Sequence, residues 1–274
     1  MHVKRFLTSI IAFPLLALLI FKGSPAVFAV FIGLVSLITL WEYYRIVFHE
    51  APHMVFSAIP VLGALSGLIV IAAAFQNSFQ WMAFSLCVNF ILAAILTLPR
   101  FKNNPFILQV VEKQVQGVMY IPLALSTIVL LRNGQDGVVW VFFLLFTVFA
   151  GDVGAFYAGK SFGRHKLSPA ISPGKTIEGS IGGMALCVAV GCGFIYSFAF
   201  LPHFNIFKVL LLLAVINLTS QAGDLFESEL KRVGHIKDSG AILPGHGGIL
   251  DRIDALLFAA PVVYMFKAFL LAGG

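Results

Sequence analysis

Charged side chains are scarce in this sequence, and their scarcity excludes an ordinary fold in water. Only 11% of the 274 residues are Asp, Glu, Lys or Arg, whereas soluble domains average about 25%. A soluble protein of this length covers its core with a polar surface, and too few polar side chains are present to make one. With 59% hydrophobic residues, the composition predicts an integral membrane protein.

Cysteine is also rare. The three cysteines, Cys87, Cys187 and Cys192, lie in apolar runs, and their odd number and unpaired spacing predict neither a disulfide framework nor a zinc site. We expect them to pack as small apolar residues. The apolar run after Arg5 has no convincing small-residue cleavage site, so it predicts a retained helix rather than a cleaved signal peptide.

Long apolar runs dominate what remains. A helix that crosses the hydrocarbon core needs about 20 mostly apolar residues. The runs that qualify, some of them short, are 6–21, 25–47, 54–75, 79–98, 115–131, 137–158, 178–201, 206–228 and 249–271. The sequence therefore predicts an all-α polytopic membrane protein of about nine transmembrane helices.

The distribution of positive charge predicts the orientation. If the N-terminus is cytoplasmic, 14 of the 18 Lys and Arg residues face the cytoplasm, and only Lys22, Arg132, Lys208 and Lys267 face the other side. This bias follows the positive-inside rule and places the C-terminus on the opposite side from the N-terminus. The same bias accounts for the net charge of +6 without nucleic acid as a partner. Anionic lipid or a phosphorylated substrate fits better.

Acidic residues concentrate in the second half of the chain. Eight of the 12 fall between Asp152 and Asp254, several of them in or beside apolar spans. Ionisable groups at membrane depth are costly and indicate function. We therefore expect residues 1–135 to form a lipid-facing scaffold. Residues 136–274 would form the catalytic region, with cytoplasmic loops at 159–177 and 229–248.

The densest polar pattern runs from Gly223 to Asp254. A helix through Arg232 would align Asp224, Ser228 and Lys231 on one face. A glycine-rich segment that ends at Gly248 follows, with backbone N–H groups suited to a phosphate. Carboxylates beside Lys and Arg suit a magnesium–phosphate site. The plain alternative is a cluster of salt bridges at the membrane surface.

The same stretch resembles the signature of the phosphatidate cytidylyltransferase (CDP-diacylglycerol synthase) family. Every fixed position is filled with unaltered spacing: Ser228-x-x-Lys231-Arg232, Lys237-Asp238, Pro244-Gly245-His246-Gly247-Gly248 and Asp251-Arg252-x-Asp254. The preceding Gly223-Asp224-Leu225 also fits. So many fixed polar positions make a chance match improbable.

A second block is similar to the same family. Asp152, Gly159-Lys160 and Phe162-Gly163 precede the run Ser172-Pro-Gly-Lys-Thr-Ile-Glu-Gly179, which resembles the family's Ser-Pro-x-Lys-Thr-x-Glu-Gly stretch. Lys175 and Thr176, just before a helix N-terminus, are placed to meet a nucleotide phosphate. The alternative is a locally capped helix start, with Thr176 and Glu178 as the capping residues.

The resemblance implies a reaction in phospholipid biosynthesis: CTP and phosphatidate give CDP-diacylglycerol and pyrophosphate. It implies a magnesium-dependent enzyme of the bacterial inner (plasma) membrane with its active site facing the cytoplasm. A second metal ion and a homodimer are left open. Catalytic roles are expected for Asp224, Ser228, Lys231, Asp251 and His246; phosphate contacts for Lys175, Thr176, Arg232, Lys237 and Arg252; and metal ligation for Asp224, Asp251 and Asp254, with Glu227 as an alternative third ligand.

Two other functions were weighed. An ion or proton transporter would use the membrane carboxylates, but it leaves the basic glycine-rich loops unexplained. A CDP-alcohol phosphotransferase would need an Asp-Gly-x-x-Ala-Arg run, which the sequence lacks. Residues 154–161 match the P-loop pattern, but they follow a membrane span rather than a strand, and we expect no P-loop there. Gly179 and Gly183 predict close helix packing.

Overall fold

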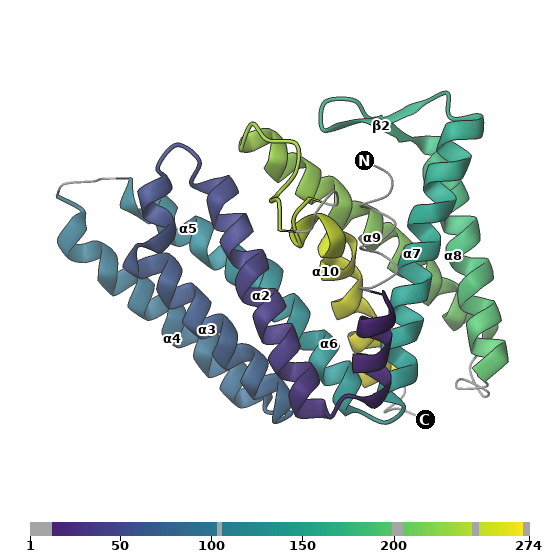
Figure 1. Cartoon of the computed structure of the whole chain (residues 1–274), viewed down its shortest axis with the longest axis horizontal. Coiled ribbons are helices and arrows are strands. Elements are labelled where there is room, and N and C mark those ends of the chain that lie inside the picture. Colours follow the sequence, from purple (N-terminus) through teal and green to yellow (C-terminus); the bar gives the residue numbers. More distant parts are fainter. Residues whose placement is uncertain (1–12, 103–105, 199–204, 243–246, 271–274) are drawn as a thin grey trace. The chain divides into compact units, whose positions relative to one another are not determined.

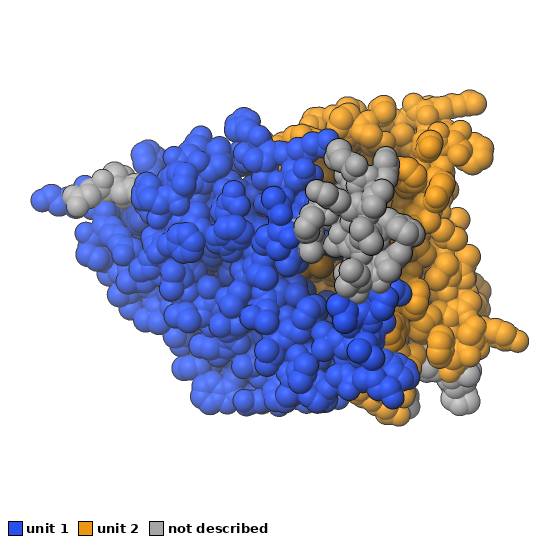
Figure 2. Space-filling view, in the orientation of Figure 1, with its two compact units in different colours: residues 1–133, 233–252 blue, residues 134–232, 253–274 orange. Residues whose placement is uncertain are grey.

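The computed structural model describes residues 13–102, 106–198, 205–242 and 247–270. The chain forms two compact units, which Figure 2 colours separately. Unit 1 comprises residues 1–133 and 233–252, and unit 2 comprises residues 134–232 and 253–274. The glycine-rich segment thus belongs with the N-terminal helices, although it lies between two helices of unit 2 in sequence.

Unit 1 is a bundle of apolar helices (Figure 1). A helix over Phe13–Lys22 precedes its labelled elements, which are α2 (Pro25–Val47), η1 (Pro52–Phe56), α3 (Ala58–Phe75), α4 (Phe79–Thr97), η2 (Leu98–Arg100), α5 (Ile107–Val118), η3 (Met119–Leu123) and α6 (Ala124–Asn133). Ser24 caps α2 by accepting a hydrogen bond from the Val27 N–H, and Pro25 occupies the first turn, where a missing N–H costs nothing. The start of α2 thus follows local sequence signals.

Partly buried polar contacts fix helix ends of unit 1. Arg132 donates hydrogen bonds to the carbonyl oxygens of Ile20 and Gly23, both at 3.1 Å. Lys113 donates to the carbonyl oxygen of Val47 at 2.7 Å. The last carbonyls of a helix have no partner within the helix, so these cations satisfy groups that the helices themselves leave open.

Unit 2 contains α7 (Gly137–Phe162), β1 (Lys166–Ser168), β2 (Ser172–Thr176), α8 (Ile177–Phe198), α9 (Ile206–Val233), α10 (Leu250–Met265) and η4 (Phe266–Leu270). The last residue of α9 and the first turn of α10 are counted with unit 1. Strands β1 and β2 pair antiparallel, with Lys166 opposite Thr176. The predicted cytoplasmic loop 159–177 therefore begins within α7 and contains a short hairpin (Figure 1).

Glycines let α7 and α8 pack closely. A Cβ atom at Gly183 would lie 2.7 Å from the carbonyl oxygen of Gly151, and one at Gly179 would lie 2.8 Å from that of Ala155. Only a hydrogen atom fits at such a distance from a neighbouring backbone. The prediction of close packing from Gly179 and Gly183 is confirmed.

The helices confirm an all-α polytopic membrane protein. Among the described residues, seven helices are long and apolar enough to cross a membrane. Two of the nine predicted spans fall short: the first extends into residues outside the described ranges, and the last is 16 residues of α10 followed by the π-helical η4. The predicted fifth span is a longer helix, which continues through a π turn at Pro122. Residues 154–161 lie inside α7, so no P-loop is present there.

Candidate active site

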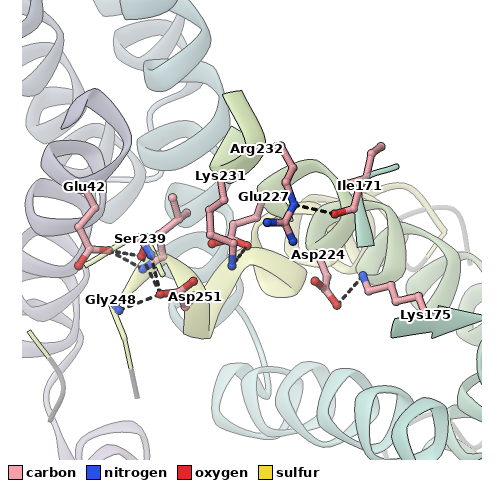
Figure 3. A network of polar contacts seen from close by, with 11 residues as sticks. Glu42, Ile171, Lys175, Asp224, Glu227, Lys231, Arg232, Ser239, Gly248 and Asp251 are labelled. Carbon is pink, nitrogen blue, oxygen red and sulfur yellow. Dashed lines mark hydrogen bonds and ion pairs between the residues drawn. The ribbon is translucent and has the colours of Figure 1, made fainter. Parts of the chain in front are cut away.

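Two clusters of polar contacts, one in each unit, contain charged residues, and Figure 3 draws the residues of both. We call Glu42, Ser239, Gly248 and Asp251 of unit 1 the loop cluster. We call Lys175, Asp224, Glu227 and Lys231 of unit 2 the ion-pair cluster. Most of these residues come from the two sequence blocks that resemble the cytidylyltransferase family.

The ion-pair cluster joins those two blocks. Lys175 of β2 lies 2.6 Å from a carboxylate oxygen of Asp224 in α9. The two side chains are only 24% and 36% exposed, which shields the pair partly from water. Residues 49 positions apart in sequence thus meet, as the shared resemblance of the two blocks predicts.

The hairpin that carries Lys175 is anchored at several points. The Thr176 hydroxyl accepts a hydrogen bond from the Gly179 N–H at 3.1 Å, which caps α8. The Glu178 carboxylate accepts the N–H groups of Arg164 and His165. Arg232 donates from Nε to the carbonyl oxygen of Ile171 at 3.0 Å. These contacts hold Lys175 in place, and they give Thr176 and Arg232 local tasks; phosphate contacts by these two residues stay predictions.

A polar face runs along α9. Asp224, Ser228 and Lys231 lie on a continuous helix, since α9 extends to Val233. Glu227 is fully buried and pairs with Lys231 at 2.5 Å. A buried carboxylate needs hydrogen bonds or an ionic partner to offset the lost water, so Lys231 has a structural task beside the catalytic one expected from the sequence.

Two further carboxylates lie near Asp224. Asp152 of α7 and Asp254 of α10 are each close enough for their charges to interact with that of Asp224. Gly223 explains the approach of α10, because a Cβ atom there would lie 2.5 Å from the carbonyl oxygen of Asp254. Asp152 precedes the second block in sequence, and the sequence predicted no role for it. Its position inside an apolar span was the available signal.

The carboxylates of unit 2 suit a hard cation only in part. Among the residues that the structure describes, no three Asp, Glu, His or Cys side chains converge closely enough to hold a metal ion by themselves. Magnesium is usually held by one or two carboxylates together with substrate phosphates. Asp224 and Asp254 offer that donor chemistry, so the predicted ligation fits a site that substrate would complete.

The loop cluster uses its carboxylates differently. Oδ2 of Asp251 accepts the N–H groups of Ser239 and Gly248, at 2.9 and 2.8 Å, and lies 3.0 Å from the Ser239 hydroxyl. Two backbone N–H donors and a hydroxyl shared with Glu42 surround this one oxygen, so Oδ2 is committed to the loop. Metal ligation by Asp251 stays a prediction, which this hydrogen bonding does not favour.

Glycine in the loop is required by close contact with these carboxylates. Gly247 has a φ of 81°, in the region that favours glycine. A Cβ atom at Gly248 would lie 2.5 Å from both carboxylate oxygens of Glu42. The sequence suggested that these glycines free N–H groups for a phosphate, whereas the Gly248 N–H donates to Asp251.

Glu42 is the residue that the sequence interpretation missed. It lies in α2, in the half of the chain assigned to the scaffold, and it is fully buried. The signal that could have identified it is the one that also marks Asp152, a carboxylate within an apolar span.

The other predicted site residues are only partly described. Ser228 is half-buried, Lys237 and Arg252 are exposed, and His246 lies outside the described residues.

Comparison with known proteins agrees with the resemblance. A sequence model of the Cytidylyltransferase family matches residues 3–270. The phosphatidate cytidylyltransferase of Staphylococcus aureus (strain COL) is 33% identical over 262 residues, which cover 94% of this chain and 96% of that protein. The phosphatidate cytidylyltransferase of Bacillus subtilis (strain 168) is 37% identical over 181 residues, which cover 65% of this chain and 66% of that protein.

Proposed function

The chain belongs to the cytidylyltransferase family, and from this premise we propose that it transfers CMP from CTP to phosphatidate. The products are CDP-diacylglycerol and pyrophosphate. The ion pair between Lys175 and Asp224 carries the proposal. It brings together the two sequence blocks that resemble the family. It also places a lysine, which can bind phosphate, beside a carboxylate, which can bind a cation.

In the proposed reaction, a phosphate oxygen of phosphatidate attacks the α-phosphorus of CTP. The bond between the α-phosphorus and the oxygen that bridges it to the β-phosphorus breaks, and pyrophosphate leaves. The attacking oxygen is already an anion, so no general base is needed. The protein then contributes orientation of the two phosphates and neutralisation of their charge. The residues of the ion-pair cluster are suited to both tasks.

Lys175 would exchange its carboxylate partner, Asp224, for phosphate oxygens. Lys231 would stay paired with the buried Glu227. Lys175 reaches Asp224 from a hairpin that other contacts hold in place, so its ammonium group needs little reordering. Lysine binds phosphate as a compact charge on a flexible stem. Lys237 and Arg252, both exposed, would supply further contacts to the nucleotide or the lipid headgroup.

Asp224, with Asp254 as the second carboxylate, would hold a magnesium ion. When bound, the ion would offset the charge of the phosphates during transfer. Asp152, whose charge interacts with that of Asp224, would add to the negative charge that attracts the ion. Magnesium dependence is thus part of the proposal, and the number of ions is left open.

The polar face of α9 also supports an enzyme over a transporter. The face includes Asn217, Gln221 and Asp224, whereas residues 209–216 are all apolar. A transport path should continue with polar groups across the span. An apolar half-helix fits a site that opens to one side, which we propose is the cytoplasm, the source of CTP.

The test is pyrophosphate release by the purified, detergent-solubilised protein with CTP, magnesium and phosphatidate. We expect release that depends on phosphatidate and falls strongly in Lys175→Ala. Lys208→Ala is the matched control, because Lys208 is exposed near the opposite end of α9 from Asp224. Folded wild-type protein that releases no pyrophosphate, while liposomes containing it show an ion flux, would overturn the proposal in favour of a transporter.

A further inference from the structure

Glu42 is a buried carboxylate without a local reason to be there. Its relative exposure is 0%, and it lies in α2 among apolar residues. Burial of a carboxylate is costly unless hydrogen bonds compensate for the lost water. The contacts of Glu42 therefore indicate what the residue is for.

All the contacts of Glu42 given by the structure are to the segment near Gly248, about 200 residues away in sequence. Oε1 accepts the Ile249 N–H at 3.1 Å, and Oε2 accepts the Leu250 N–H at 2.8 Å. These N–H groups belong to the first residue of α10 and the residue before it, and Figure 3 shows Glu42 facing Ser239 of the same segment. The first N–H groups of a helix need an outside acceptor, and Ile249 has no polar side chain to provide one. Glu42 thus caps α10 from another helix.

Glu42 is also connected to Asp251. The Ser239 hydroxyl lies 3.0 Å from Oε2 of Glu42 and 3.0 Å from Oδ2 of Asp251. The glycines fit the same arrangement, since a Cβ atom at Gly240 would lie 2.5 Å from Oε1 of Glu42. The two carboxylates therefore join Ser239, Gly248 and the first turn of α10 in one hydrogen-bonded unit.

We infer that Glu42 is a positioning residue for the reaction, and this inference rests on the proposed function. By capping α10 and sharing Ser239, it sets the direction in which the first turn presents Asp251 and Arg252. Stability alone would be served more simply by Ser or Asp at position 249 and an apolar residue at position 42. A local cap would satisfy the N–H groups of α10 but would not fix where the turn lies. A carboxylate from α2 does both, because it holds the turn at one location relative to α2.

The variant to test is Glu42→Gln, which keeps the size of the side chain but replaces one acceptor oxygen with an NH₂ group. That group would face a backbone N–H, so one contact is lost. We expect kcat for pyrophosphate release to fall about 10²-fold, as for a misplaced reacting group, with the KM for CTP changed much less. Ser239→Ala should lower kcat less, and its effect should not add to that of Glu42→Gln. Glu112→Gln, which alters an exposed carboxyl of α5, should leave kcat unchanged.

A second measurement separates this inference from the proposed function. Hydrogen exchange in the peptide that covers residues 247–252 should be faster in Glu42→Gln than in wild type or Glu112→Gln. Unchanged protection overturns the positioning role, whatever the activity. Lost protection with wild-type kcat per folded molecule also overturns it, since Glu42 would then serve stability only. A wild-type protein that releases no pyrophosphate would count against the proposed function, and the exchange result would still decide whether Glu42 fixes the turn.

Discussion

The loop cluster of unit 1 and the ion-pair cluster of unit 2 use the same residue types in opposite ways. In the loop cluster, the carboxylates of Glu42 and Asp251 accept backbone N–H groups. In the ion-pair cluster, the carboxylates of Asp224 and Glu227 face lysine ammonium groups. A backbone N–H cannot leave without unfolding the turn, whereas a lysine side chain can rotate to another anion.

This difference separates the residues of one sequence signature into two tasks. Asp251 lies in a hydrogen-bonded turn that also contains Gly248 and Ser239, so its first effect is on the shape of the loop. Asp224 has a lysine partner, Lys175, which we propose that substrate phosphates draw away. The same residue type, with similar spacing around it, thus acts on the backbone in one unit and on mobile charges in the other.

The largest effect is expected for Asp224→Asn in the ion-pair cluster. The change removes the charge opposite Lys175 and a proposed metal ligand, and pyrophosphate release should fall about 10²–10³-fold. Glu229→Gln is the matched control, because Glu229 is an exposed carboxyl of the same helix. Activity retained in Asp224→Asn would break the comparison, since the ion-pair cluster would then have no chemical task.

A smaller loss is expected for Gly248→Ala in the loop cluster. The new methyl group would lie 2.5 Å from both oxygens of Glu42 and would push the turn away. We expect kcat to fall about 10–100-fold through misplacement of the turn, measured as pyrophosphate release per folded molecule. Gly174→Ala should be silent, because a Cβ atom there has no neighbour within 4 Å. A fully active Gly248→Ala would show that the loop geometry does not matter to the reaction.

Glycine has a different purpose in unit 2, and Gly183→Leu tests it. The side chain would collide with the backbone of α7 at Gly151 and force α7 and α8 apart. Overpacking of this kind should reduce the free energy of unfolding by about 1–3 kcal/mol, measured by thermal unfolding in detergent. Gly193→Leu on the same helix is the control, since a Cβ atom at Gly193 meets nothing within 4 Å. Equal stability of the two variants would contradict the packing role.

The smallest effect is expected for Thr176→Ala, which removes the cap of α8. Loss of a capping hydroxyl lowers stability by about 1 kcal/mol, and Thr176→Ser should restore it. Measuring the KM for CTP in the same variants sharpens the comparison. An unchanged KM would leave Thr176 with a capping role only, and a raised KM in Thr176→Ala that Thr176→Ser restores would support the predicted phosphate contact.

Much of the fold could be predicted because hydropathy and helix caps are local. The predicted span 25–47 coincides with α2, Pro25–Val47, where Ser24 and Pro25 define the start. The hairpin was not expected, because the pairing of Lys166 with Thr176 depends on contacts with Arg232 and Glu178 rather than on an alternating apolar pattern. The meeting of Lys175 and Asp224 was implied only by their common resemblance to one family.

The sequence by itself determined the class of protein, the helical spans and the two blocks that carry the chemistry, because composition and spacing are properties of neighbouring residues. Only the tertiary structure decided which carboxylates face lysines and which face backbone N–H groups. Asp224 and Asp251 are both aspartates of the same polar stretch. Asp224 pairs with Lys175, 49 residues away, whereas Asp251 accepts N–H groups of Ser239 and Gly248. Glu42 is the clearest case, since its partners at Ile249 and Leu250 cannot be identified until the chain has folded.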